Sequence, residues 1–338
     1  MVTYSAPRDD LRFVLNELHG YAGRVAALPG CEEAGIDLLE TVLDEAARFC
    51  ENELLPLNQP GDQAGCTFEN GVVRTPDGFK EAYQAFRVGG WTGLACHPDY
   101  GGQGLPKTLQ FVVSEIICST NLSFGTYPGL SHGAYHLLER CASDEQKATF
   151  LPHLADGSWS GTMCLTEPHC GTDLGLIRTR AEPGEKGAYK ISGTKIFISA
   201  GEHDLTENIV HLVLAKLPDA PPGVKGISLF IVPKFLVGAD GSPGPRNGVA
   251  CGGIEDKMGI KASATCVLNF DEAEGYLVGA PHSGLRAQFT MMTMARLTVG
   301  LQGLGLAETA YQSAVAYARE RLAGRSLAGP ARPDQPAD

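Results

Sequence analysis

The stretch Met163-Cys164-Leu165-Thr166-Glu167-Pro168-His169-Cys170-Gly171-Thr172-Asp173 is the most informative part of this 338-residue chain. Thr166 and Thr172 offer two hydroxyls, and Gly171 allows the backbone to turn closely enough to direct N–H groups at an anion. On these residues alone, the segment is either an ordinary loop between a helix and a strand or an anion-binding loop. The chain on either side has to decide between the two.

The pattern of apolar residues differs between the two sides of this stretch. Before it, residues 35–155 carry apolar side chains at helical spacing, as in Leu39, Val42, Leu43, Ala46 and Ala47. After it, short β-branched and apolar runs alternate with Gly and Pro at residues 189–191, 195–199, 209–215, 227–232 and 265–270. Strands grouped between blocks of helix predict an α+β fold with an antiparallel β domain, not a doubly wound sheet.

The two ends of the chain add further elements. An amphipathic helix is predicted at residues 8–27, and a long helix resumes at 283–323, where several glycines indicate close packing. Prolines at 330, 333 and 336 then predict a linker. The predicted units are a helical extension (1–34), a helical domain (35–156), a β domain (157–280), the first long helix of an incomplete helical domain (281–325) and a tail (326–338).

Composition restricts the classes of function. A formal net charge of -12, from 27 basic and 39 acidic residues, disfavours binding to a phosphate backbone. Ten cysteines occur without a CxxC pair, and the amino terminus lacks the apolar core of a signal peptide. No apolar run reaches the roughly 20 residues that cross a bilayer. We therefore expect a cytoplasmic protein with no membrane span and no nucleic-acid partner.

The stretch at 163–173 resembles the signature of the acyl-CoA dehydrogenase family. Four further segments match that family in its order: residues 193–201 (GTKIFISAG), 257–263 (KMGIKAS), 295–296 (AR) and 319–324 (RERLAG). The resemblance covers residues 35–325 and implies an amino-terminal helical domain, a middle β domain that contacts FAD, and the start of a helical bundle. Cys170 and Leu176 stand where small residues are usual, and Phe197 stands where tryptophan is usual.

The resemblance assigns roles by position. Residues that would contact FAD are Met163, Cys164, Leu165, Thr166, Gly171, Thr172, Phe197, Ile198 and Ser199, with Arg321 reaching a flavin pyrophosphate across a subunit boundary. Residues that would contact the acyl-CoA are Thr172, Thr293 and Arg296. Glu167 is expected to be a structural anchor, and not the catalytic base.

The reaction that the resemblance implies is dehydrogenation of an acyl-CoA thioester to the trans-2-enoyl-CoA. A carboxylate removes the α-proton, and a hydride leaves the β-carbon for the flavin. Ala295 occupies the base position of one branch of the family, and the position used by the other branch falls beyond Asp338. The sequence thus predicts no catalytic base within these residues and an inactive chain when expressed alone.

The details most resemble the larger members of the family, which include 3-methylmercaptopropionyl-CoA dehydrogenases and their long-chain relatives. The implied partners are an electron-transfer flavoprotein and further copies of the chain, as a homodimer or homotetramer. Two alternatives stay open: an acyl-CoA oxidase, and a non-catalytic flavoprotein of the adaptive-response DNA-repair type.

No metal site is predicted. His132 and His136 have a spacing that could present two imidazoles on one helical face, as metal ligands need, but no third ligand is evident.

Overall fold

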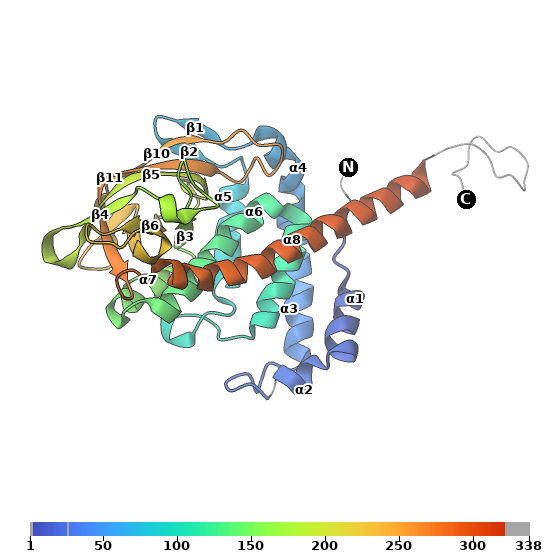
Figure 1. Cartoon of the computed structure of the whole chain (residues 1–338). Helices are drawn as coiled ribbons and strands as arrows, with labels where there is room; N and C mark the ends of the chain where they lie inside the picture. Colours follow the sequence, from blue (N-terminus) through green and yellow to red (C-terminus); the bar gives the residue numbers. More distant parts are fainter. Residues whose placement is uncertain (1–2, 26, 322–338) are drawn as a thin grey trace, which may run out of the picture.

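The computed structural model describes residues 3–25 and 27–321, so the predicted tail at 326–338 lies outside the described residues. Strands gather at one end of the molecule and helices at the other, while α8 crosses both and projects beyond the body (Figure 1). The helices are α1 (Arg8–Arg12), α2 (Tyr21–Val25), α3 (Ile36–Phe49), α4 (Leu55–Ala64), α5 (Phe79–Val88), α6 (Lys107–Cys141), α7 (Asp144–Ala155) and α8 (Gly284–Glu320). The strands are β1 (Thr67–Glu69), β2 (Val72–Arg74), β3 (Trp159–Cys164), β4 (Arg180–Pro183), β5 (Tyr189–Ser199), β6 (Asn208–Lys216), β7 (Ile227–Pro233), β8 (Phe235–Val237), β9 (Pro243–Arg246), β10 (Val249–Ile254) and β11 (Thr265–Val278).

The α6 helix is the centre of the helical domain and contains a kink. Asn121 leaves helical geometry at φ -155° and ψ 88°. Its side chain accepts a hydrogen bond from the Phe124 N–H and donates one to the Leu54 carbonyl, so it caps the second half of α6. The predicted apolar stripe of α3 is buried against this helix, as its spacing requires.

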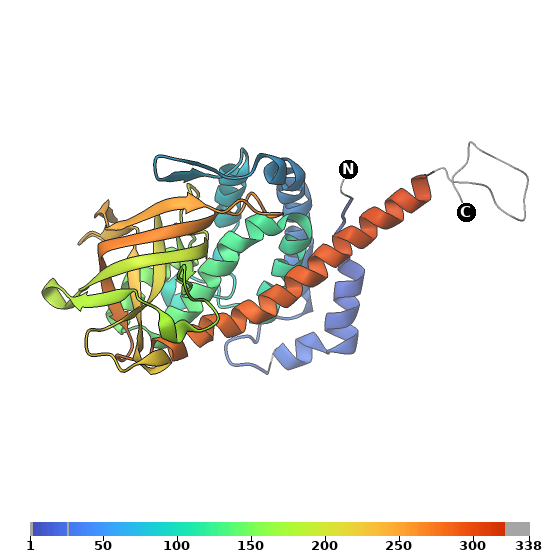
Figure 2. The ribbon, with the colours of Figure 1, turned by 45° about the horizontal axis from the view of Figure 1, so that its top comes forward.

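The strands form a mixed sheet, which corrects the expectation of a purely antiparallel one. Most pairs are antiparallel, but β3 runs parallel to β6, and β4 makes a short parallel contact with β6. The chain leaves β3, passes through β4 and β5, and returns at β6, which supplies the long crossover that parallel pairing needs. Because β7 pairs with both β6 and β11, the sheet curves back on itself (Figure 2).

The two runs predicted at 189–191 and 195–199 are one strand, β5. Near its end, one extra residue of β5 bulges against β11, where the register shifts between Cys266 and Leu268. Phe197 lies at this bulge with a left-handed φ of 59°, and Ala200 follows at 54°. The bulge therefore redirects the last residues of β5 away from the regular ladder.

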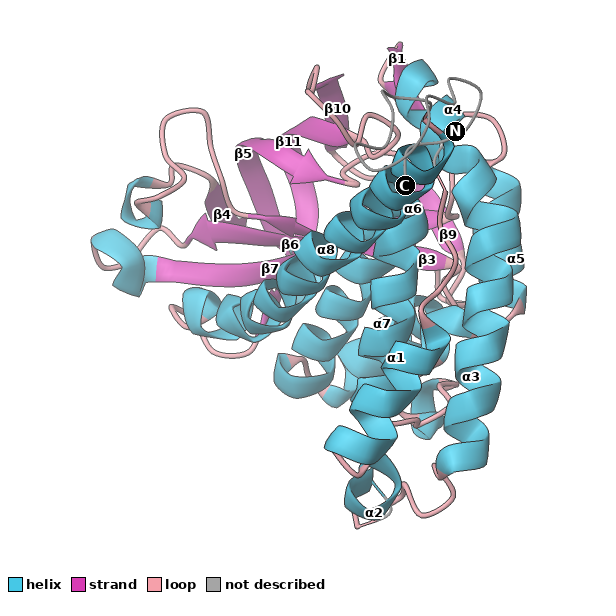
Figure 3. Cartoon of the chain, turned by 90° about the vertical axis from the view of Figure 1, so that its right-hand side faces the viewer, coloured by secondary structure: helices cyan, strands magenta, loops and turns pink. Residues whose placement is uncertain are grey.

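The amino-terminal helix predicted at 8–27 is interrupted. Helical geometry runs from Arg8 to Leu18, with wider turns after Arg12, and stops before Gly20, whose φ of 58° cannot continue a helix. Arg8 contacts Asp44 at 2.9 Å, and Arg12 pairs with Glu40, so α1 lies beside α3 (Figure 3).

The α8 helix confirms the predicted long helix, and its first turn packs tightly. A Cβ on Gly284 would lie 2.3 Å from the carbonyl carbon of Ser228, which explains the glycine there. Leu297 and Leu304 are exposed on the described chain. Among the described residues, no helix combines the length and apolarity that a membrane crossing requires.

Candidate functional site

The loop after β3 is held by a buried ion pair. Glu167 is 3% exposed, and its carboxylate accepts hydrogen bonds from Lys195, from the backbone and hydroxyl of Thr179, and from the Arg178 N–H. Burial alone would raise the pKa of Glu167, but the Lys195 ammonium and these hydrogen bonds outweigh it and lower the pKa. Such contacts support the expected role of Glu167 as an anchor.

Lys195 joins this loop to β5. Its ammonium lies 2.8 Å from Glu167 Oε1 and 2.9 Å from the Leu165 carbonyl, and its side chain is fully buried. The Ile196 N–H donates to the Thr166 carbonyl at 2.9 Å. These bonds place the loop at 165–172 beside the end of β5, so the two segments predicted to contact the flavin lie together.

The outer side of the loop presents polar groups that the described chain leaves unpaired. Within the described residues, the N–H groups of Gly171 and Thr172 and the hydroxyls of Thr166, Thr172 and Ser199 make no hydrogen bond. Gly171 and Thr172 are exposed. Unpaired donors on an exposed loop are available to an anionic or polar ligand.

Space around Gly171 is tight, and its conformation is not left-handed. A Cβ at this position would lie 3.1 Å from Thr166 Cγ2 and 3.5 Å from the Thr166 hydroxyl, so a side chain here would press against Thr166. The predicted close approach of the Gly171 backbone to an anion stays a prediction.

The other predicted flavin residues divide into two groups. Phe197 is 58% exposed in its strained conformation, which is typical of a residue placed for contact with a partner molecule. The side chains of Cys164 and Ile198 instead lie in the core of the β domain, where burial raises the pKa of Cys164 to about 12. Only the backbone of these two residues is available to a ligand, and Met163 packs partly against the core below the loop.

Two of the three predicted substrate residues, Thr293 and Arg296, lie on α8, and the third, Thr172, lies in the loop after β3. Thr293 is exposed, and its hydroxyl donates to the Phe289 carbonyl within the helix at 2.8 Å. The Arg296 guanidinium lies 5.8 Å from the centre of the Phe289 ring. Neither side chain contacts the loop at 165–172 directly within the described chain.

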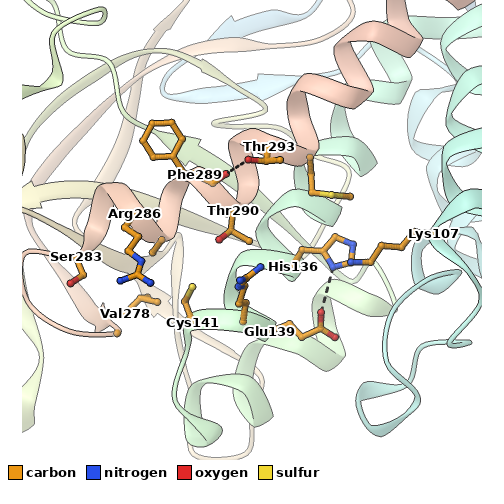
Figure 4. Close-up of a pocket in the computed structure, with 14 residues that line it drawn as sticks. Lys107, His136, Glu139, Cys141, Val278, Ser283, Arg286, Phe289, Thr290 and Thr293 are labelled. Carbon is orange, nitrogen blue, oxygen red and sulfur yellow. Dashed lines mark hydrogen bonds and ion pairs between the residues drawn. The ribbon is translucent and has the colours of Figure 1, made fainter. Parts of the chain in front are cut away.

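A cavity of about 930 Å³ lies between α6 and the first turns of α8 (Figure 4). Arg286 and Thr290 from α8 face Glu139 and Cys141 from α6 across it, and Thr293 forms part of its edge. Lys107, Arg140 and Arg286 line it, and within the described residues none of these three makes an ion pair. The cavity thus has a positive lining in a chain of net charge -12.

Arg321 is separated from these groups. It directly follows α8, whose carboxyl-terminal end lies far from the β domain (Figure 1), and its guanidinium lies 5.6 Å from the centre of the Tyr317 ring. The structure does not bring it to the loop of its own chain, which is compatible with the predicted contact across a subunit boundary.

The described residues contain one cluster with metal-ligating atoms, formed by Glu167, His169 and Cys170. The Glu167 carboxylate is already bound to Lys195, and His169 Nε2 lies 3.0 Å from the Leu176 carbonyl. The His132 and His136 rings also have partners, in the Thr92 carbonyl at 2.7 Å and the Glu139 carboxylate at 3.5 Å. We therefore assign no metal to either group.

The pairing of Lys195 with Glu167 was not predictable from the sequence, because nothing in the spacing of 28 residues indicates the pair. Two buried histidines of the β domain, His203 and His211, were also not predicted. His203 Nε2 lies 2.9 Å from the Ser160 hydroxyl, and His211 Nδ1 lies 2.9 Å from the Thr162 hydroxyl. Because the His203 Nδ1 accepts from the Leu205 N–H, its Nε2 carries the proton and cannot activate Ser160 as a nucleophile.

Two family models match most of the described chain. The acyl-CoA dehydrogenase N-terminal domain matches residues 37–158, and the acyl-CoA dehydrogenase middle domain matches residues 162–273. The short-chain specific acyl-CoA dehydrogenase of Clostridium acetobutylicum is 30% identical over 85% of this chain and 70% of that protein. The chain belongs to the acyl-CoA dehydrogenase family.

Similar family members are often much longer than this chain. The 3-methylmercaptopropionyl-CoA dehydrogenase of Ruegeria pomeroyi is 48% identical over 98% of this chain and 56% of that protein. A butyryl-CoA dehydrogenase of Syntrophomonas wolfei is 37% identical over 88% of this chain and 51% of that protein. The chain therefore spans about half the length of these curated relatives.

Solved structures give the same family fold. The butyryl-CoA dehydrogenase of Megasphaera elsdenii superimposes with a TM-score of 0.71 at 26% identity, over 87% of this chain and 71% of that one. An acyl-CoA dehydrogenase of Bacillus anthracis complexed with FAD gives 0.70 at 25% identity, over 86% of this chain and 45% of that one. The helical domain, the β domain and the start of the carboxyl-terminal helical region are thereby shown.

Proposed function

We propose that this polypeptide provides the FAD-binding body of an enzyme that dehydrogenates an acyl-CoA thioester to the trans-2-enoyl-CoA. The proposal rests on the loop at 165–172. The ion pair of Glu167 and Lys195 holds its buried side in place. Its exposed side has hydrogen-bond donors that no described residue binds. A loop of this kind is rigid and still has hydrogen bonds to offer, as a preorganised cofactor site requires.

The residues fit the chemistry of a flavin. The hydroxyls of Thr166 and Ser199 would hydrogen-bond the ring, and Phe197 would pack against its edge. The Gly171 and Thr172 N–H groups would bind the pyrophosphate, because close backbone donors stabilise phosphate oxygens. FAD, when bound, accepts the hydride from the substrate β-carbon.

The substrate would lie between this loop and α8. Thr172, Thr293 and Arg296 are the side chains that we assign to the acyl-CoA. The acyl group could be 3-methylmercaptopropionyl, as the name of the Ruegeria pomeroyi relative supports, or a medium or long chain. The cavity beside α8, which Lys107, Arg140 and Arg286 line, is an alternative site for the phosphates of CoA.

The partners follow from the same proposal. We propose a cytoplasmic enzyme that assembles as a homo-oligomer and passes electrons to an electron-transfer flavoprotein. A solved structure described for the electron transferring flavoprotein of Acidaminococcus fermentans, similar to this chain with a TM-score of 0.70 and 28% identity, supports the last step. An oxidase is the alternative acceptor class, and rapid reoxidation of the reduced flavin by air would favour it.

Flavin loading and ligand titration test the proposal. The purified chain should bind FAD and should shift its absorbance on addition of acyl-CoA without oxygen. Bleaching of the oxidised-flavin absorbance should be slow, because Glu167 is held in its ion pair with Lys195 and Ala295 cannot accept a proton. Arg296→Ala should weaken the acyl-CoA-induced shift at least tenfold, whereas a larger loss in Arg286→Ala would place the phosphates in the cavity. Failure of the chain to bind FAD at all would refute the proposal.

A further inference from the structure

Residues 3–6 lie against the distal part of α8, more than 300 positions away in the sequence (Figure 2). The Ser5 N–H donates to Gln312 Oε1 at 2.8 Å, and Gln312 Nε2 donates back to the Ser5 carbonyl at 2.9 Å. Ser313 makes the same pair of bonds with Thr3, at 3.2 and 3.3 Å. Two adjacent side chains of α8 thus bind the extended backbone much as a neighbouring strand would.

The other side of this segment is fixed to the body. The Ala6 N–H donates to Glu51 Oε1 at 2.7 Å. Between these two attachments, Tyr4 is 7% exposed and belongs to the core of the helical domain. Its burial raises the pKa of the phenol well above the ordinary value, so the side chain remains neutral.

The same region of α8 has few other attachments. Beyond Met291, Gly305 is the one buried residue of the described helix. A Cβ on Gly305 would lie 2.9 Å from the Ser119 N–H nitrogen, and the Thr309 hydroxyl donates to the Ser119 carbonyl at 2.5 Å. The backbone of Ser119 is therefore a point at which α6 meets this part of α8.

We propose that residues 3–6 form an intramolecular clamp on α8, with Tyr4 as the positioning residue that fixes the direction in which the helix leaves the body. The segment lies outside the two matched domain models, which cover residues 37–158 and 162–273. Its consequence for the flavin rests on the proposed function of Arg321.

The length of α8 beyond Gly305 sets how far a tilt of the helix would move Arg321. Arg321 lies about 24 Å beyond Gly305 at 1.5 Å per residue, so a tilt of about 10° would move its backbone by roughly 4 Å. A hydrogen bond tolerates only a few tenths of an ångström. Without the clamp, Arg321 would seldom occupy the position that a pyrophosphate contact across the subunit boundary demands.

Hydrogen–deuterium exchange on the full chain tests the clamp without reference to the flavin. Tyr4→Ala and Gln312→Ala should each raise exchange at residues 306–320 at least tenfold, while the amides of α3, α6 and the sheet keep their protection. Tyr4→Phe should restore most of the protection because it keeps the buried ring. Tyr311→Ala, which removes a 66% exposed aromatic from the same helix, is the matched control and should change little.

Unchanged exchange at 306–320 in Tyr4→Ala and Gln312→Ala would overturn the clamp, as would an equal rise throughout the helical domain. The flavin readout is separate: Tyr4→Ala should weaken FAD binding several-fold, and Tyr311→Ala should not. Local loosening in a chain that never binds FAD would support the clamp and refute the proposed function. Normal FAD binding with no change in exchange would support the proposed function and refute the clamp.

Discussion

Replacing Lys195 with methionine tests how the flavin loop is held in place. Lys195 and Glu167 are 0% and 3% exposed at their side chains, and their charged atoms lie 2.8 Å apart. Methionine keeps much of the apolar stem but leaves the Glu167 carboxylate buried without its cation. Removing one partner of a buried ion pair costs about 3–5 kcal/mol, because the remaining charge is uncompensated. We expect a loss of that size in the free energy of unfolding.

The same strand supplies a matched control. Lys190 and Glu272 also lie 2.8 Å apart, but their side chains are 51% and 65% exposed. Solvent screens this pair, so Lys190→Met should cost much less than Lys195→Met. The two variants remove the same atoms from pairs with the same separation on β5, and their difference measures burial together with the loss of the Lys195 bond to the Leu165 carbonyl.

Urea unfolding of the flavin-free chain, followed by circular dichroism at pH 7.5, measures both variants. A cost for Lys195→Met no larger than that for Lys190→Met would refute the reasoning. The pH dependence gives a second check. Without Lys195, burial should raise the pKa of Glu167 above its unfolded value, so the deficit should shrink as pH falls toward that pKa. Adding Glu167→Gln should recover part of the loss at pH 7.5.

Two further predictions concern the loop and the core of the β domain. Gly171→Val places a β-branched side chain where even a Cβ lies 3.1 Å from Thr166, so flavin absorbance per chain should fall at least tenfold, with Gly171→Ala less affected. Burial lowers the pKa of His203 and of His211 to about 3, below the unfolded value near 6.5. Each should therefore stabilise the fold above pH 6.5 and lose about 1.4 kcal/mol per pH unit as pH falls from 6.5 to 3, a slope that urea titrations of a His203→Gln/His211→Gln variant should lack.

The fold was predictable where periodicity and family resemblance agreed. The stripe of α3 and the long α8 followed from apolar spacing, and the change in the apolar pattern near residue 157 separated helices from strands. The parallel pairing of β3 with β6 was not predictable, because buried strands show the same apolar runs in either orientation. The break before Gly20 was missed because glycine is tolerated in a helix pattern when its φ is unknown.

The site was predictable only in part, and for a related reason. The motif fixed which residues surround Gly171, but a sequence does not state which polar groups are already bound in the fold. Lys195 lies in an ordinary strand pattern, and the unpaired outer donors of the loop are apparent only after Glu167 and Lys195 have been brought together. Residue roles at the flavin therefore stay proposals that the variants above can test.

The geometry of the loop also argues against Glu167 as the base. A general base needs an accessible lone pair and a pKa that lets it take up a proton. Glu167 accepts four hydrogen bonds, is almost fully buried, and has its pKa lowered by Lys195. Taking a proton would break the bonds that hold the loop against β5, and the flavin donors would lose their support at the moment of reaction. A loop stabilised in this way can position a cofactor, and the proton acceptor has to come from another carboxylate.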